Sequence, residues 1–149
     1  MSAIHFTRRQ AAAAALGWAA LWAAQPATAR TAAGGIHVDV SPLMENSGEP
    51  TAGWVARELP AALAAAGVSG PISVRIDYVI LGPNSGGVSA GSSPDQMIGE
   101  VTRGGVTTPL RASSSYYPSP VDNTMIERSN FIRVSQLCRV FAEWVARGY

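Results

Sequence analysis

The sequence contains no lysine, one cysteine and two histidines, and each shortage excludes a class of function. Without lysine the chain cannot form a Walker A loop, whose lysine reaches the phosphates of a bound nucleotide. With Cys138 alone it cannot form an intrachain disulfide. Because Cys138 falls on the apolar stripe of a predicted helix, we interpret it as a buried core thiol and not as a reactive one.

Positive charge is also scarce. The eleven basic residues are all arginine, and two of them, Arg8 and Arg9, lie in a segment that we expect to be removed. The mature chain then has nine arginines against ten acidic residues, or about −1 with histidine neutral. A nucleic-acid-binding domain needs a clustered basic excess, so we exclude nucleic acid as a partner.

Residues 1–29 have the three parts of a secretory signal peptide. A positive start at Arg8 and Arg9 is followed by a mildly apolar run from Ala11 to Ala24 and by a small-x-small pattern that ends at Ala29. The run is too short to span a bilayer. We therefore predict a cleavable leader that ends near Ala29, a periplasmic location, and no membrane span after cleavage.

The paired arginines after Thr7 and the weakly hydrophobic run resemble a twin-arginine leader. Ala11 and Ala12 stand where that motif prefers bulky apolar residues, so the general secretory route stays open as the alternative. No cysteine stands directly after the cleavage site, so the likeness does not extend to a lipoprotein.

Residues 30–149 are expected to form a single domain, because 47% of the chain is hydrophobic and only 14% is charged. Alternating apolar residues predict strands at 36–41, 72–81, 97–103 and 107–117. The second of these is the expected central strand, with Tyr78 and Ile80 on its buried face and its last three residues covered on both sides. Pro42 is expected to stop the first strand, and Gly104-Gly105 to turn the last two into a hairpin.

Two helices complete the pattern. The first is predicted from Thr51 to Ala66, with a kink or break at Pro60. The second is predicted to open on the capping-box pattern of Thr124 and Glu127 and to carry one apolar stripe. The β-α-β-β-β-α order predicts an α+β two-layer sandwich, in which two helices cover one face of a four-stranded, mostly antiparallel sheet.

The alternation also assigns side chains to the two faces of this sheet. We expect the helices to cover Ile72, Val74, Ile76, Val38, Met97, Val101, Leu110 and Ala112, with Gly99 permitting close approach of a helix. The opposite, open face is expected to show His37, Asp39, Arg75, Asp77, Glu100 and Arg111, with apolar area added by Val79, Leu81 and Ile98.

Three patterns suggest chemistry, and each has a simpler explanation. Gly87-Val88-Ser89-Ala90-Gly91 matches the G-x-S-x-G nucleophile elbow, but no helix follows it directly and no histidine lies downstream, so we interpret it as part of a Gly/Ser-rich loop. The same loop lacks the helix start that holds a phosphate. His37, Asp39 and Asp77 share the open face, yet catalytic zinc takes at least two nitrogen or sulfur ligands. We therefore predict no metal, no cofactor and no catalytic residue.

The open face is the strongest candidate site. One interpretation is a set of cross-strand ion pairs that keep a half-exposed sheet solvated. The other is a docking face with Tyr116 and Tyr117 at its rim and the loop after the central strand beside it, since Tyr and Arg are enriched in protein interfaces. The candidate binding residues are Arg75, Asp77, Asn84, Ser85, Glu100, Arg111, Tyr116 and Tyr117.

Five segments carry a resemblance that extends from Val38 to Trp144: VDVSPL (38–43), ENSG (45–48), YVILGPNSGG (78–87), TPLRA (108–112) and SSYYP (114–118). In these the chain resembles a family of small, exported, functionally uncharacterised alphaproteobacterial proteins, which implies no activity or catalytic residues. At the level of fold, the order of elements is similar to small envelope accessory modules such as the lipopolysaccharide-assembly lipoprotein.

Two hypotheses of function follow. The first is a non-enzymatic periplasmic module that binds another envelope component, either a protein or a small ligand. The alternative is a small periplasmic enzyme with a site on the open face around His37, Asp39 and Asp77. Convergence of these three side chains around a concave pocket would favour the enzyme.

Overall fold

A computed structural model describes residues 29–32, 35–83, 93–115 and 125–148. Five strands form one mixed sheet in sequential order, in which only the β2–β3 pair is parallel. The strands are β1 (Ala29–Ala32), β2 (Ile36–Asp39), β3 (Ile72–Ile80), β4 (Asp95–Arg103) and β5 (Val106–Ser114). Strands β2 to β5 are the four that the sequence predicts, and β1 adds an edge strand beside β2.

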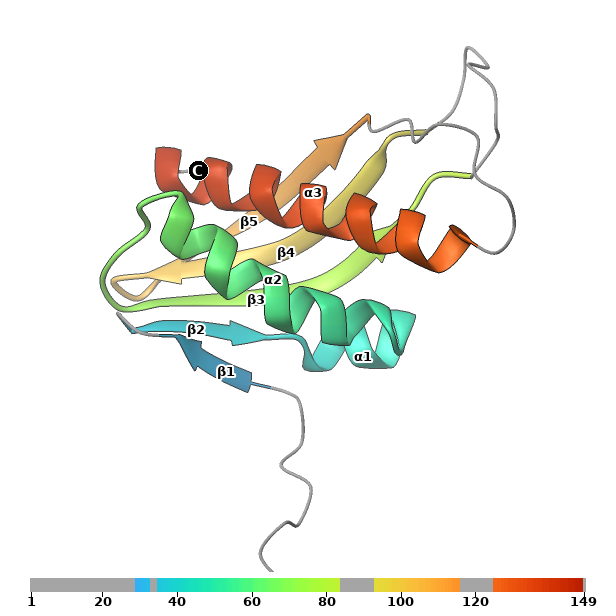
Figure 1. Cartoon of the computed structure of the whole chain (residues 1–149). Helices are drawn as coiled ribbons and strands as arrows, with labels where there is room; N and C mark the ends of the chain where they lie inside the picture. The colour runs from blue at the N-terminus through green and yellow to red at the C-terminus, as the bar shows by residue number, and fades with distance from the viewer. Residues whose placement is uncertain (1–28, 33–34, 84–92, 116–124, 149) are drawn as a thin grey trace, which may run out of the picture.

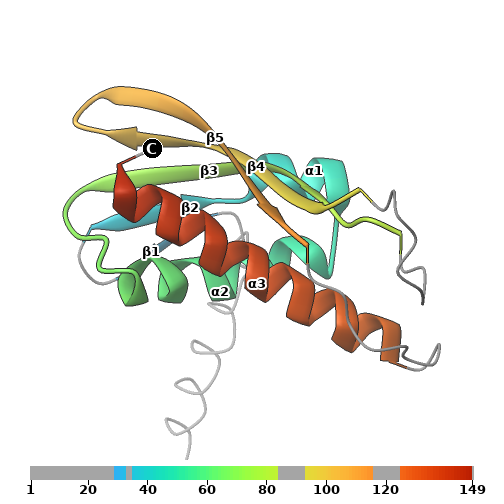
Figure 2. The same cartoon turned by 90° about the horizontal axis from the view of Figure 1, so that it is seen from above.

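Two long helices cover one face of the sheet, and a third, short helix lies at the end of β2 and also contacts α2. Helices α2 (Thr51–Ala65) and α3 (Ile126–Arg147) pack side by side on the same face (Figures 1 and 2). The short α1 (Ser41–Ser47) follows β2 and contacts β3, whose far half extends beyond the end of β2. The predicted α+β sandwich is confirmed, with α1 as an addition that the sequence pattern did not indicate.

The core lies between the sheet and the two long helices. All eight sheet residues that were predicted to face the helices are buried. From the helices, Leu59 and Leu63 on α2 and Leu137 and Phe141 on α3 complete this layer with no exposed surface. Cys138 is buried in the same layer, as expected, and burial raises the pKa of its thiol, with the charge of Glu58 as a smaller cause.

A bulge in β3 reverses the expected faces of that strand's second half. The register against β4 shifts between Ile76 and Tyr78, so Asp77 is the extra residue. Tyr78 and Ile80 are therefore 47% and 48% exposed, whereas Val79 and Leu81 pack against the core. The prediction that Tyr78 and Ile80 are buried is wrong, as is the placement of Val79 and Leu81 on the open face.

Gly99 permits the close approach of a strand and not of a helix. It lies on β4 opposite Ile76, next to the bulge, and a Cβ atom added to it would lie 2.2 Å from the backbone oxygen of Arg75. The absence of a side chain at residue 99 therefore lets β3 bend against β4.

The predictions for the prolines and the capping box have different outcomes. Pro42 lies in the first turn of α1, where proline's missing N–H is no loss, so it begins a helix as well as following a strand. Helix α2 continues through Pro60 without a break. Met125 is the N-cap of α3 and makes no side-chain cap hydrogen bond; Thr124 of the predicted capping box lies outside the described residues.

Within the described ranges, no helix has both the length and the hydropathy needed to cross a membrane.

Candidate binding face

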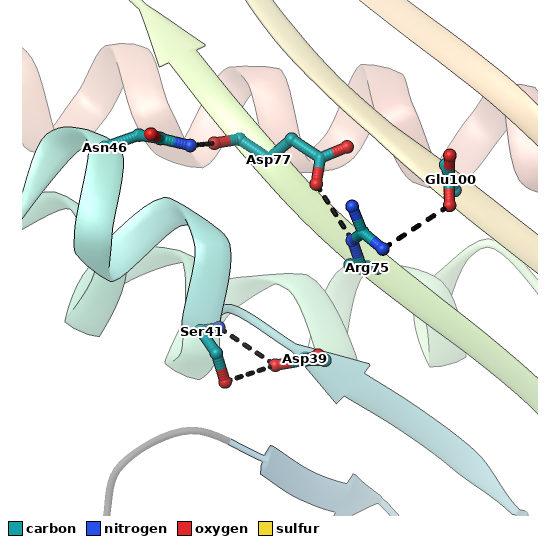
Figure 3. A network of polar contacts seen from close by, with 6 residues as sticks. All are labelled: Asp39, Ser41, Asn46, Arg75, Asp77 and Glu100. Carbon is teal, nitrogen blue, oxygen red and sulfur yellow. Dashed lines mark hydrogen bonds and ion pairs between the residues drawn. The ribbon is translucent and has the colours of Figure 1, made fainter.

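The candidate site is the face of the sheet that points away from α2 and α3, which we call the open face. It is built from alternate residues of β2 to β5, together with the bulged Asp77, and α1 borders it at the end of β2 (Figures 2 and 3). Its charged and ionisable members are those the sequence predicted: His37, Asp39, Arg75, Asp77, Glu100 and Arg111.

Arg75 is the centre of a charged cluster on this face. Its Nε donates a hydrogen bond to Asp77 Oδ1 at 2.9 Å, and its Nη1 lies 3.9 Å from Glu100 Oε2 (Figure 3). The hydrogen bond and the charge of Asp77, with a smaller contribution from Glu100, raise the pKa of Arg75. Since 51% of its side chain is exposed, water screens these pairs and they contribute little to the stability of the fold.

Three further hydrogen bonds on this side attach α1 to the sheet. Asp39 Oδ1 accepts hydrogen bonds from the Ser41 amide at 2.9 Å and from the Ser41 hydroxyl at 2.6 Å, at the start of α1. Asn46 Nδ2, near the other end of α1, donates to the backbone oxygen of Asp77 at 3.0 Å (Figure 3). The bulge thus supplies both a carboxylate to Arg75 and a backbone acceptor to α1.

His37, Asp39 and Asp77 do not converge. His37 pairs with Ser73, which lies four residues from Asp77 along β3, or roughly 13 Å. The carboxylate of Asp39 binds Ser41, and that of Asp77 binds Arg75. Among the residues that the structure describes, no group of three or more His, Cys, Asp or Glu side chains could hold a metal ion.

A second row of side chains crosses three strands next to the charged cluster. Tyr78 on β3 pairs with Ile98 on β4, and Ile98 pairs in turn with Arg111 on β5. Arg111 is exposed and makes no hydrogen bond or ion pair within the described chain. Ile80, beside Tyr78 on β3, is also half exposed. The guanidinium of Arg111, which has no partner among the described residues, therefore lies in a row with solvent-exposed apolar side chains.

Only part of the predicted binding site lies within the residues that the structure describes. It brings Arg75, Asp77 and Glu100 into contact and places Arg111 one alternate position away on β5. Four predicted binding residues and the G-x-S-x-G pattern lie outside the described residues: Asn84, Ser85, Tyr116, Tyr117 and residues 87–91.

Sequence reasoning missed one charged pair, which is buried. Arg133 on α3 and Asp95 at the start of β4 have side chains only 5% and 4% exposed. Arg133 Nε donates to Asp95 Oδ2 at 2.8 Å and its Nη2 donates to Asp95 Oδ1. The signal was present, since Arg133 stands four residues before Leu137 and eight before Phe141 on the buried stripe of α3.

The helical face carries a groove. A groove of about 370 Å³ runs between α2 and α3, lined by alanines together with Glu58, Ser135, Arg139 and Glu143. Glu58 pairs with Arg57, and Glu143 with Arg147. Two of the three charged side chains in the groove are therefore paired, whereas Arg139, like Arg111 on the open face, makes no hydrogen bond or ion pair with the described residues.

No protein-family model matches this chain, and searches of curated proteins and of solved structures found no match to it either.

Proposed function

We propose that this chain is an exported, non-enzymatic module that binds another component of the cell envelope on its open face. The observation that carries the proposal is the row of Tyr78, Ile98 and Arg111, where an arginine without a partner among the described residues adjoins an exposed tyrosine and a partly exposed isoleucine. Interfaces concentrate their binding energy in such Tyr and Arg side chains.

The rigidity of the face also supports binding. Its side chains stand on strands whose other side packs against α2 and α3, and the bulge at Asp77 is fixed by Arg75 on one side and by Asn46 on the other. A surface that is already ordered loses little conformational entropy when a partner docks. The separation of His37, Asp39 and Asp77 gives the enzyme hypothesis no comparable support.

The location of the module in the periplasm belongs to the same proposal and is supported by the leader pattern in residues 1–29. It is tested by cell fractionation and by the mass of the exported protein. The expected product is periplasmic and begins at Arg30. A full-length chain in the cytoplasm would overturn the assigned compartment.

Site-specific photocrosslinking in living cells tests the binding function. A photoreactive phenylalanine analogue in place of Tyr78 should give a discrete product with an envelope component, identified by mass spectrometry, and Arg111→Glu should reduce that product. The control places the same analogue at Arg128, which is exposed on α3 in the opposite layer. Equal amounts of crosslinked product from positions 78 and 128 would overturn the proposal. So would a result in which position 78 crosslinks only to another copy of this chain, or to nothing.

A further inference from the structure

The side chains of the open face form a self-complementary pattern. In register across the two central strands, Arg75 on β3 stands opposite Glu100 on β4, and Tyr78 on β3 stands opposite Ile98 on β4. Each row therefore holds a complementary pair: opposite charges in the first, and two apolar partners in the second.

A two-fold axis parallel to the strands and between β3 and β4 would place β3 of one copy over β4 of another. Because such a rotation keeps each row level, Arg75 of each copy would face Glu100 of the other, and Tyr78 of each would face Ile98 of the other. Both contacts would occur twice, as an isologous interface requires. No pair of like charges is brought together in these two rows.

We propose that the open face docks a second copy of this chain, so that two sheets pack face to face and the helices of both copies form the outer layers. This inference rests on the proposed function, because it concerns the same face. The dimer is the state without an envelope partner, and the two kinds of binding exclude each other.

The edges of the face agree with this arrangement. Arg111 on the β5 side would lie over the β2 side of the second copy, one alternate position along the strand from Asp39. That offset is roughly 7 Å, within reach of an extended arginine side chain between sheets about 10 Å apart. The Arg111 guanidinium, which has no partner among the described residues of its own copy, thus acquires a nearby carboxylate in the other.

The size of the face sets the expected strength. Four strands about 4.8 Å apart and seven residues rising about 3.3 Å each give a face of roughly 19 by 23 Å. This is smaller than the standard interface, which buries about 800 Å² on each partner. We therefore expect a reversible dimer with a dissociation constant in the micromolar range.

Charge reversal with mixing tests the proposed symmetry. Arg75→Glu alone would set two carboxylates against each other at both contacts, and Glu100→Arg alone would set two guanidinium groups against each other. Each variant should therefore dimerise roughly tenfold or more weakly. Mixed in equal amounts, the two variants form heterodimers in which one contact joins two unmodified side chains and the other joins two reversed ones. Both contacts then pair opposite charges, and the mixture should return to the dissociation constant of the unmodified protein. The measurement is sedimentation velocity on the exported protein across the micromolar range.

Three comparisons make the outcome decisive. Thermal melting of each single variant shows whether the fold persists. Arg128→Glu makes the same charge reversal at an exposed position on α3 and should leave the dimer unchanged. An unmodified protein that stays monomeric would overturn the dimer, as would a mixture no tighter than either variant. If position 78 still crosslinks to an envelope component in a monomeric chain, the dimer fails and the proposed function stands. If the protein dimerises but position 78 gives no crosslink to an envelope component, the proposed function fails and the dimer stands.

Discussion

Arg133 on α3 holds Asp95 at the start of β4 through two hydrogen bonds, and both side chains are almost completely buried. The same guanidinium donates from Nη2 to the backbone oxygen of Gly82 at 2.6 Å, and Asp95 Oδ1 accepts from the Gly82 amide at 2.8 Å. One ion pair therefore joins α3, the start of β4 and the segment just after β3.

Replacing Arg133 with methionine should destabilise the protein by about 3–5 kcal/mol, because it leaves the carboxylate of Asp95 buried without its partner. The measurement is the free energy of unfolding in urea. Arg75→Met is the matched control: its ion pairs are exposed, and its unfolding midpoint should stay close to that of the unmodified protein. Equal effects of the two substitutions would contradict a structural role for the buried pair.

Gly99→Ala should destabilise the protein by roughly 1–3 kcal/mol, the usual cost of overpacking. The new Cβ would lie 2.2 Å from the backbone oxygen of Arg75. Because that oxygen belongs to the backbone, rotation of a side chain cannot relieve the contact. Urea unfolding again supplies the measurement.

Gly53→Ala is the comparison for Gly99→Ala. Its Cβ would meet only the flexible carboxylate of Glu49, at 2.7 Å, inside helix α2. There the helical preference of alanine over glycine, about 1 kcal/mol, works in favour of the folded state. A Gly99→Ala protein as stable as the Gly53→Ala protein would show that β3 and β4 separate freely at the bulge.

Alternation in the sequence was sufficient to predict four of the five strands and most of the assignment of side chains to the two faces, since buried and exposed residues must alternate along a strand. It failed at Asp77, because a bulge inserts one residue and shifts every later side chain to the other face. The polar contacts of α1 were equally beyond the pattern, since a helix of seven residues has too few turns to show an apolar stripe.

Alternation predicted which charged side chains share the open face, but it did not predict their partners. Arg75 and Glu100 meet because they stand opposite each other on adjacent strands, and Asp77 reaches Arg75 from two residues further along β3. Arg133 was overlooked because an arginine in a helix usually faces water. Its carboxylate partner, Asp95, lies 38 residues away, and no local pattern links the two.

Val74→Asp should prevent soluble expression, while Ser73→Asp should be tolerated. Val74 is fully buried between sheet and helices, so a carboxylate there would be buried without a partner, at a cost of more than about 4 kcal/mol. Ser73, one residue earlier, lies on the open face opposite Thr102. The yield of soluble protein and its melting temperature measure the difference. Soluble, folded Val74→Asp protein would contradict the assignment of β3 as the central strand.

Cys138 should make stability fall with rising pH above the ordinary pKa of a thiol, 9.0. Burial raises the pKa of this thiol in the folded state, so above pH 9 the unfolded chain loses the proton while the folded chain keeps it. The unfolded state then binds fewer protons, and the free energy of unfolding decreases with pH. For one group the slope is at most about 1.4 kcal/mol per pH unit.

The Cys138→Ala protein isolates this contribution, because every other ionisable group is present in both proteins. The difference in unfolding free energy between unmodified protein and variant should be constant below about pH 8. Between about pH 9 and 10 the unmodified protein should lose about 1 kcal/mol of stability relative to the variant. Urea unfolding at each pH gives both values, and iodoacetamide should modify the thiol only in urea. Parallel pH curves for the two proteins would mean that the thiol ionises equally in both states, which requires that water reach the layer between α3 and the sheet.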